Sequence, residues 1–134
     1  MFRRAEELRY FFYGYEQHLA AERGWRFPEE VWKEIWSGSA EASVGHVSPR
    51  SRGRRERERR EELVDRLGNP LLLPEGANER LGDRDPQDKA EDYAKSGSLV
   101  AREVAEALNR PWTEKAIAER EERLLDWAKR AWGD

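Results

Sequence analysis

The sequence predicts an α+β fold that is predominantly α-helical, with one short two-stranded hairpin packed among flanking helices. Two observations lead to this prediction. Apolar residues recur at a spacing of three and four through the first 36 residues and again from residue 86 onward, which is the period of amphipathic helices. Between these regions lie two short apolar runs, 42–47 and 70–73, and each ends shortly before a proline, as brief strands often do.

Two helices are predicted before the hairpin. The first covers residues 5–23, where apolar side chains form one stripe and Gly24 is placed to end the helix. This stripe consists of Leu8, Phe11, Phe12, Tyr15 and Leu19. The second helix covers residues 28–36, and a break of small residues follows at 37–40. Its apolar face consists of Val31, Trp32, Ile35 and Trp36.

The strand at 42–47 is expected to present His46 at its end. A loop and then a helix over 55–67 precede the second strand, and one to two helical turns follow it at 76–81. The remaining helices are predicted at 86–95, at 98–108 and from Thr113, which serves as an N-cap.

A chain of 134 residues is long enough for one modest core, so we expect a single domain over 1–134. We divide it into an N-terminal helical part at 1–40, a hairpin core at 41–84 with an arginine-rich insertion at 50–60, and C-terminal helices at 85–134.

Composition excludes several classes of protein. No apolar run approaches the roughly 20 residues that span a bilayer, and residues 1–7 lack the apolar stretch of a signal peptide. The chain has no cysteine, which excludes disulfides and a thiolate zinc site and fits an intracellular protein. We therefore expect a cytoplasmic protein with no membrane partner.

The net charge of −3 hides a strongly basic segment. Residues 50–60 hold seven arginines and two glutamates, so this segment carries +5 and the rest of the chain about −8. Such a segment suits the phosphates of a nucleic acid, and the candidate contacts are Arg50, Arg52, Arg54 and Arg55. The alternative is a solvated helix face in which Glu56 and Glu58 offset neighbouring arginines.

Three polar side chains lie around the predicted strands. His46 comes at the end of the first, before Val47-Ser48-Pro49, Asn69 lies within Gly68-Asn69-Pro70 at the start of the second, and Asn78 lies on the short helix. An imidazole titrates near neutrality and suits a general base, and an amide oxygen is a hard ligand for a divalent cation. Each residue also has a plain structural interpretation, as a strand end, a turn or a helix cap.

The order of strand, connection, strand and helix around these residues resembles the ββα-metal (HNH, or His-Me finger) motif of HNH endonucleases. It resembles in particular the nuclease domain at the C-terminal end of GmrSD-type, modification-dependent restriction enzymes. The similarity extends through an aromatic helix ending in Tyr15-Glu16 and through Leu67-Gly68-Asn69-Pro70-Leu71-Leu72-Leu73. Farther along, the similar residues are Asn78, Lys89, Tyr93, Ser96, Trp112, Thr113, Ile117, Arg120, Leu124, Ala128 and Trp132.

The resemblance implies a DNA endonuclease module that cuts phosphodiester bonds in restriction or anti-phage defence. It makes His46 the general base, Asn69 the residue that positions the loop and the histidine, Asn78 a ligand of Mg²⁺ (or Mn²⁺), and Lys89 a phosphate contact. The implied partners are DNA and an N-terminal nucleotide-dependent sensor domain or partner subunit, because this chain shows no Gly-rich phosphate loop.

Gly45 departs from the family pattern, which has a metal-binding acidic residue directly before the histidine. Three explanations stay open. Another acid such as Glu41, Asp65 or Asp83 reaches the site, the metal binds weakly through Asn78 and waters, or cleavage has been lost. If cleavage has been lost, the domain is a nucleic-acid-binding module on a catalytically lapsed HNH scaffold. A further alternative is a helical protein-interaction domain, which the acidic balance outside 50–60 supports.

Overall fold

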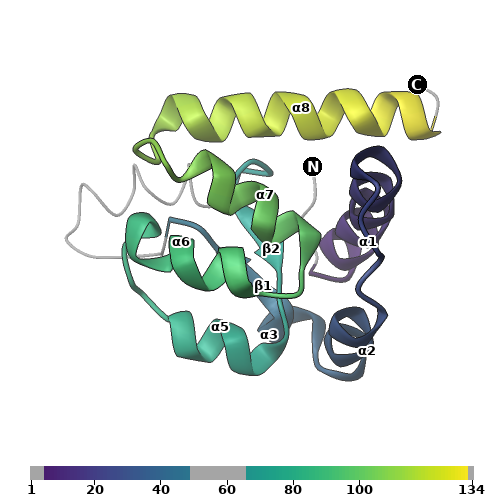
Figure 1. The fold of residues 1–134 in the computed structure, drawn as a ribbon, viewed down its shortest axis with the longest axis horizontal. Helices are drawn as coiled ribbons and strands as arrows, with labels where there is room; N and C mark the ends of the chain where they lie inside the picture. Colours follow the sequence, from purple (N-terminus) through teal and green to yellow (C-terminus); the bar gives the residue numbers. More distant parts are fainter. Residues whose placement is uncertain (1–4, 49–65, 133–134) are drawn as a thin grey trace.

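The computed structural model describes residues 5–48 and 66–132, which form seven helices and one two-stranded antiparallel sheet (Figure 1). The predicted class, mostly helical with a two-stranded sheet, is confirmed. The elements are α1 (Ala5–Arg23), α2 (Glu29–Ser37), α3 (Ala40–Ser43), β1 (Val44–His46), β2 (Pro70–Leu72), α5 (Glu75–Leu81), α6 (Pro86–Lys95), α7 (Leu99–Ala107) and α8 (Glu114–Trp132). The helix predicted at 55–67 lies outside the described residues, except that 66 and 67 form a bend and a turn.

The two strands pair with a register that sets the histidine against a proline. Val44 pairs with Leu72, Gly45 with Leu71, and His46 with Pro70. Because proline has no N–H, this end of the ladder lacks one donor. The backbone pairing continues just beyond the strands, where Val47 N–H donates to Asn69 O at 3.1 Å.

The first strand is shorter than predicted because its first two predicted residues belong to a helical turn. Residues 42 and 43 belong to α3, so the prediction of a strand from 42 was wrong. Ser39 caps this turn by accepting a hydrogen bond from Ala42 N–H at 3.1 Å. The serine in the small-residue break is therefore a helix start, a signal that the sequence contained.

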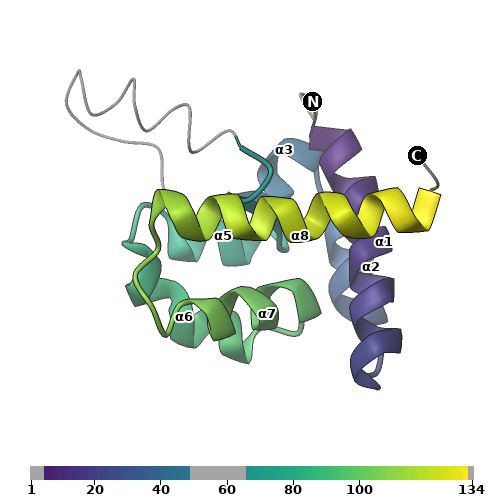
Figure 2. The same cartoon turned by 90° about the horizontal axis from the view of Figure 1, so that it is seen from above.

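The hairpin lies in the interior of the molecule, between α8 along one side and α5 along the other (Figure 1). Seen from above, α8 crosses over α1 at a steep angle and α6 and α7 run beside it (Figure 2). Leu71, Leu72 and Leu73 are at most 1 % exposed and join one continuous apolar core with the aromatic face of α1. No helix in the two described ranges is long and apolar enough to cross a membrane.

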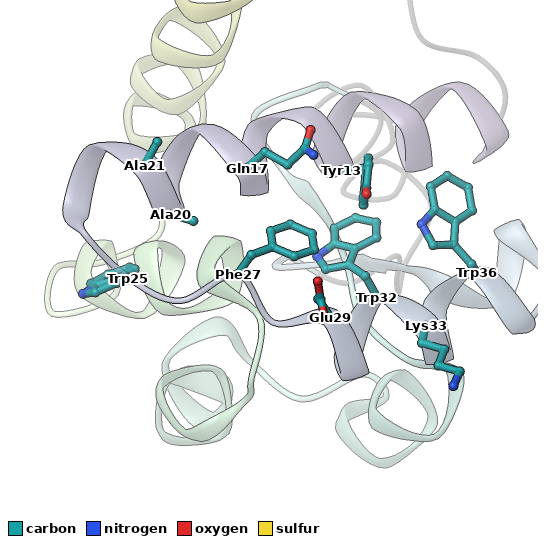
Figure 3. Close-up of a pocket in the computed structure, with 10 residues that line it drawn as sticks. All are labelled: Tyr13, Gln17, Ala20, Ala21, Trp25, Phe27, Glu29, Trp32, Lys33 and Trp36. Carbon is teal, nitrogen blue, oxygen red and sulfur yellow. The ribbon is translucent and has the colours of Figure 1, made fainter.

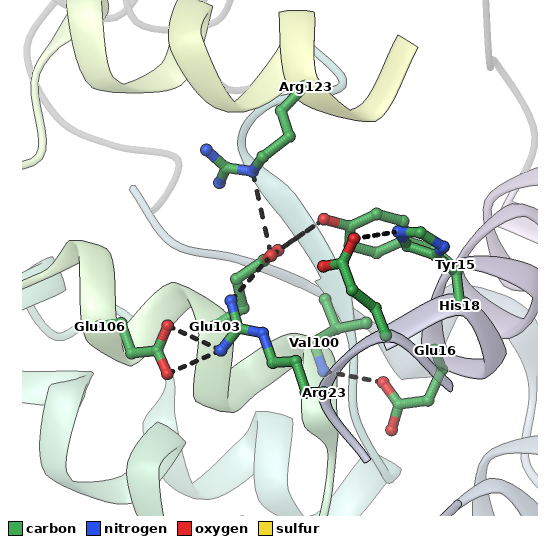
Figure 4. Close-up of polar contacts among 9 residues, drawn as sticks. Tyr15, Glu16, His18, Arg23, Val100, Glu103, Glu106 and Arg123 are labelled. Carbon is green, nitrogen blue, oxygen red and sulfur yellow. Dashed lines mark hydrogen bonds and ion pairs between the residues drawn. The ribbon is translucent and has the colours of Figure 1, made fainter. Parts of the chain in front are cut away.

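Buried polar side chains fasten α1 to α7 (Figure 4). The Glu16 carboxylate is fully buried and accepts hydrogen bonds from the N–H groups of Leu99 and Val100 at 2.7 and 2.8 Å. Burial raises the pKa of Glu16, while these two donors at the start of α7 act against that shift. The preceding residue, Tyr15, donates a hydrogen bond from its hydroxyl to the Glu103 carboxylate on α7 at 2.9 Å. The Tyr-Glu pair noted in the sequence thus joins two helices.

The loop before β2 packs directly on α8. A Cβ atom at Gly68 would overlap the Ile117 carbonyl oxygen and lie 2.9 Å from its carbonyl carbon. We expect Gly68→Ala to lower the free energy of unfolding by about 1–3 kcal/mol or more, the usual cost of overpacking against a rigid neighbour. Gly76→Ala is the control, because nothing lies within 4 Å of that site and alanine favours helix α5. Urea unfolding of both variants measures this, and equal stabilities would contradict the close contact.

Candidate active site

His46 and Asn78 lie around one pocket, although 32 positions of sequence separate them. His46 ends β1, Asn78 lies in the middle of α5, and the pocket between them has a volume of about 200 Å³. Its other lining residues are Val44, Gly45, Leu81, Gly82, Asp83, Lys89 and Tyr93. The structure therefore brings together two of the three polar residues selected from the sequence, whose chemical roles stay predictions.

The nitrogen of the Asn78 side-chain amide is hydrogen-bonded, and its oxygen lies against Gly45. Its Nδ2 donates to the carbonyl oxygens of Ala42 at 2.9 Å and Leu73 at 3.4 Å, which tie α5 to α3 and to the end of the hairpin. Its Oδ1 lies over Gly45, so close that a Cβ atom at position 45 would overlap it and lie 3.3 Å from Asn78 Cγ. Gly45 does not have a positive φ, so space rather than backbone conformation requires the glycine.

Asn69 holds the loop that follows the histidine. Its Oδ1 accepts hydrogen bonds from Ser48 N–H at 2.9 Å and from Trp112 Nε1 at 3.0 Å, and its Nδ2 donates to Ser48 O at 3.0 Å. The side chain is fully buried, so each of these bonds matters for its stability. Asn69 is not among the pocket's lining residues and holds the backbone of Ser48, two residues after His46, so its role in positioning the histidine stays a prediction.

Lys89, the predicted phosphate contact, is buried against the backbone of the histidine strand. The side chain is 2 % exposed, and its ammonium donates to the carbonyl oxygens of His46 at 2.8 Å and Val47 at 3.3 Å. Burial lowers the pKa of Lys89 to about 8, and the nearby Asp83 carboxylate acts against this shift. Lys89 therefore holds the histidine strand from inside, and contact with a phosphate stays a prediction.

Arg120 fixes the second strand in the same manner. Its Nη1 donates to Gly68 O and Pro70 O, both at 2.8 Å, and burial lowers the pKa of its guanidinium to about 10. The carbonyl groups at this end of β2 thus receive donors from α8. The sequence marked Arg120 as a match to the family's terminal helix, but no local pattern indicated that an arginine on a charged helix would be 2 % exposed.

The three acids considered as replacements for a carboxylate at position 45 have different places. Asp83 lines the pocket, whereas Glu41 is exposed on α3 and is absent from the pocket lining. Asp65 lies outside the described residues, as do Arg50, Arg52, Arg54 and Arg55, so their predicted contacts with nucleic acid stay predictions. Asp83 is the acid that the structure brings to His46 and Asn78.

The donors around the pocket fit one kind of cation better than others. Within residues 5–48 and 66–132, no three histidine, aspartate or glutamate side chains group to hold a metal. A closed zinc site needs four such ligands, whereas Mg²⁺ keeps several waters and takes one or two carboxylates. One carboxylate, Asp83, and one amide oxygen, Asn78 Oδ1, are donors of the type that Mg²⁺ accepts.

A second pocket, of about 640 Å³, lies between α1 and α2 (Figure 3). Five aromatic side chains line it: Tyr13, Trp25, Phe27, Trp32 and Trp36. None of its lining residues belongs to β1, β2 or α5, and no histidine is among them. This pocket therefore contains none of the polar residues selected from the sequence, and the smaller pocket, which contains two of them, is the candidate active site.

One known family matches most of the chain. Residues 2–127 match the family described as GmrSD restriction endonucleases, C-terminal domain. The chain belongs to this family. The resemblance inferred from the sequence is therefore confirmed, and membership of a GmrSD restriction endonuclease family implies a nuclease module with DNA as its substrate. Comparison with curated proteins and with solved structures gives no match.

The fit between Gly45 and Asn78 predicts that substitutions at the two positions are coupled. Gly45→Ala alone should cost about 1–3 kcal/mol of stability, because the methyl group displaces a hydrogen-bonded amide. In an Asn78→Ala background the amide is absent, so the same substitution should cost much less. Chemical denaturation of the four proteins gives the coupling energy, expected at about 0.5–3 kcal/mol. Additive effects would contradict the overlap.

Burial of Lys89 predicts a pH dependence of stability. The pKa of Lys89 is about 8 in the folded chain, against 10.5 for the unperturbed side chain, so between these values the unfolded chain binds more protons. Stability from this group must therefore rise with pH across that window. We expect the free energy of unfolding of the parent to increase relative to Lys89→Met between pH 8 and 10, with exposed Lys115→Met as control. A constant difference would contradict the buried ammonium.

Proposed function

We propose that this GmrSD-family domain hydrolyses phosphodiester bonds of DNA by a metal-dependent HNH mechanism, acting in the cytoplasm in restriction or anti-phage defence. In this proposal β1, β2 and α5 form a ββα-metal core. The observation that supports it most directly is the shared pocket, which His46 enters from β1 and Asn78 from α5. An imidazole and an amide oxygen beside one small cavity are the parts that this chemistry needs.

His46 acts as the general base in this mechanism. Its neutral imidazole takes a proton from water, and the resulting hydroxide attacks phosphorus in line with the departing 3′ oxygen. For this step the backbone that carries the imidazole must be held in a fixed position. Lys89 holds the His46 carbonyl, and Asn69 holds both backbone groups of Ser48, so the chain is fastened at and just after the histidine.

Asn78 takes part through its carbonyl oxygen. Because Nδ2 donates to Ala42 and Leu73, Oδ1 is the end of the amide directed toward Gly45 and the pocket that both residues line. Oδ1 is a ligand of the type that Mg²⁺ or Mn²⁺ accepts. When bound, such a cation supplies positive charge next to the phosphate and the leaving oxygen as negative charge develops there.

Binding and triggering require further parts. The arginines at 50, 52, 54 and 55 are proposed to contact the DNA backbone, because this segment carries the chain's excess of positive charge. An N-terminal nucleotide-dependent sensor domain or a partner subunit is proposed to supply recognition, since the family is a C-terminal domain of its enzymes.

One observation favours a second candidate function. Gly45 gives no side-chain ligand where the family pattern has an acid, which is expected if the domain binds nucleic acid without cutting it. Affinity would then come from arginine contacts with phosphates and would fall steeply with salt. Cleavage and retention of the same DNA distinguish the two functions.

The test is nicking of supercoiled plasmid in Mg²⁺ and in Mn²⁺. We expect the parent chain to nick the plasmid and His46→Ala to lose at least about 100-fold in rate, since a positioned general base contributes that much or more. The chain has two histidines, and His18, which packs beside Tyr15 and Trp127, provides the matched control His18→Ala. Circular dichroism of each variant checks the fold.

Three results would contradict the proposal. Cutting by His46→Ala at the parent rate would remove the histidine from the mechanism. Salt-sensitive retention of DNA by a parent chain that never cuts would support the binding module instead. Neither cutting nor retention would exclude both functions and leave the helical interaction domain.

A further inference from the structure

Asp83 is the acidic side chain among the described residues that line the candidate active site. It is exposed and makes no hydrogen bond or ion pair with any described residue. Other buried acids have hydrogen-bond partners. Glu16 on α1 accepts from the N–H of Leu99, and Glu103 accepts from the Tyr15 hydroxyl. A carboxylate that borders a small polar pocket and has its oxygens available is placed to bind a ligand there.

The end of α5 brings Asp83 to the same pocket as Asn78. The helix stops at Leu81, and Gly82 N–H donates to Asn78 O at 2.9 Å, so Asn78 and Gly82 are joined across one helical turn. Gly82 then adopts φ +52° and ψ −133°, which a residue with a side chain rarely adopts. Asp83 comes directly after this turn and lines the same pocket as Asn78.

The charges around the pocket agree with this position. Lys89 also lines the pocket, and Asp83 is the acid that most strongly favours the charged form of Lys89, ahead of Asp85. Asp83 thus acts on a buried ammonium that donates hydrogen bonds to the backbone carbonyls of His46 and Val47. Because the ammonium makes no hydrogen bond to the carboxylate, Asp83 keeps its oxygens for another partner.

Position 45 is closed to a carboxylate by the structure itself. Asn78 Oδ1 occupies the space that a Cβ atom at 45 needs, so an acid there and this asparagine conformation exclude each other. The chain therefore has a glycine at position 45, an asparagine, Asn78, whose oxygen lies over that glycine, and an acid, Asp83, five residues after the asparagine.

We propose that Asp83 and Asn78 together bind the divalent cation, and that Asp83 supplies the carboxylate which Gly45 cannot. This rests on the proposed function, because the cation serves the same phosphodiester chemistry. One carboxylate, one amide oxygen and waters form a coordination shell that Mg²⁺ and Mn²⁺ accept. Because the site has one anionic ligand and that ligand is exposed, the cation binds weakly, and a DNA phosphate strengthens the binding. His46 stays outside the shell as the base.

The test measures Mn²⁺ itself on the full chain, by electron paramagnetic resonance of the free ion. We expect Asp83→Asn to weaken Mn²⁺ binding by at least about 10-fold, the minimum usual for loss of a group that supports a metal site. Asp85→Asn is the matched control, because it removes the same charge two residues away, also near Lys89, but does not line the pocket. Its effect should stay below about twofold, since salt screens exposed charges.

The two histidines locate the bound ion. Mn²⁺ broadens nearby proton resonances, so the imidazole signals of His46, which lines the pocket, should broaden at low Mn²⁺ while those of His18 persist. Asp83→Asn should abolish this selectivity. Broadening of both histidines alike in the parent would show adventitious binding and overturn the proposal.

Other outcomes separate this proposal from the function on which it rests. Absence of Mn²⁺ binding by the parent at millimolar concentration, or equal losses in the Asp83 and Asp85 variants, would overturn the Asp83 site. Plasmid nicking by Asp83→Asn at the parent rate would do the same and leave the nuclease intact. Mn²⁺ binding that depends on Asp83 in a parent that does not cut DNA would support the metal site and contradict the nuclease.

Discussion

The amide of Asn78 depends on a glycine at position 45, and the arrangement of the candidate active site follows from that dependence. Because Gly45 has no Cβ, Oδ1 lies over β1 while Nδ2 reaches the carbonyls of Ala42 and Leu73. One side chain thereby connects α5, the end of α3 and the end of the hairpin. A larger residue at 45 would break these bonds or push α5 away from β1, and the pocket between His46 and Asn78 would change shape.

Buried cations hold the hairpin from both sides. Lys89 from α6 donates to the carbonyls at the end of β1, and Arg120 from α8 donates to those around β2. Burial of either charge costs stability, as the lowered pKa values of both groups show. A two-stranded sheet is marginal by itself, and within residues 5–48 and 66–132 these donors satisfy carbonyl groups that no third strand covers. The site is therefore built on a small hairpin made rigid by its helices.

The sequence predicted the helices well because their apolar stripes repeat at helical spacing and because one face of each must be buried. It also predicted the hairpin, since prolines bound both runs. It missed α3, because Ala40 and Ser43 were interpreted as a break and as part of a strand, although Ser39 is an N-cap. Periodicity has little power over an element of four residues.

For the site, the family resemblance selected His46, Asn69 and Asn78, and the structure places two of them, His46 and Asn78, around one pocket. Their chemical roles stay predictions. The sequence left three explanations for Gly45 open, because a single sequence does not reveal that the Asn78 side-chain oxygen fills the space beside it. The burial of Lys89 and Arg120 was equally hidden, since both lie on helices rich in charge and only tertiary packing decides which cation faces inward.

The most direct test of the account is a crystal structure of the domain grown with Mn²⁺ and a short DNA duplex, with the ion located by its anomalous scattering. The account predicts one strong peak in the pocket of about 200 Å³, in ligand contact with Asn78 Oδ1 and an Asp83 carboxylate oxygen and next to a DNA phosphate. His46 should lie on the opposite side of that phosphate. A peak bound elsewhere, or DNA placed away from His46, would contradict it.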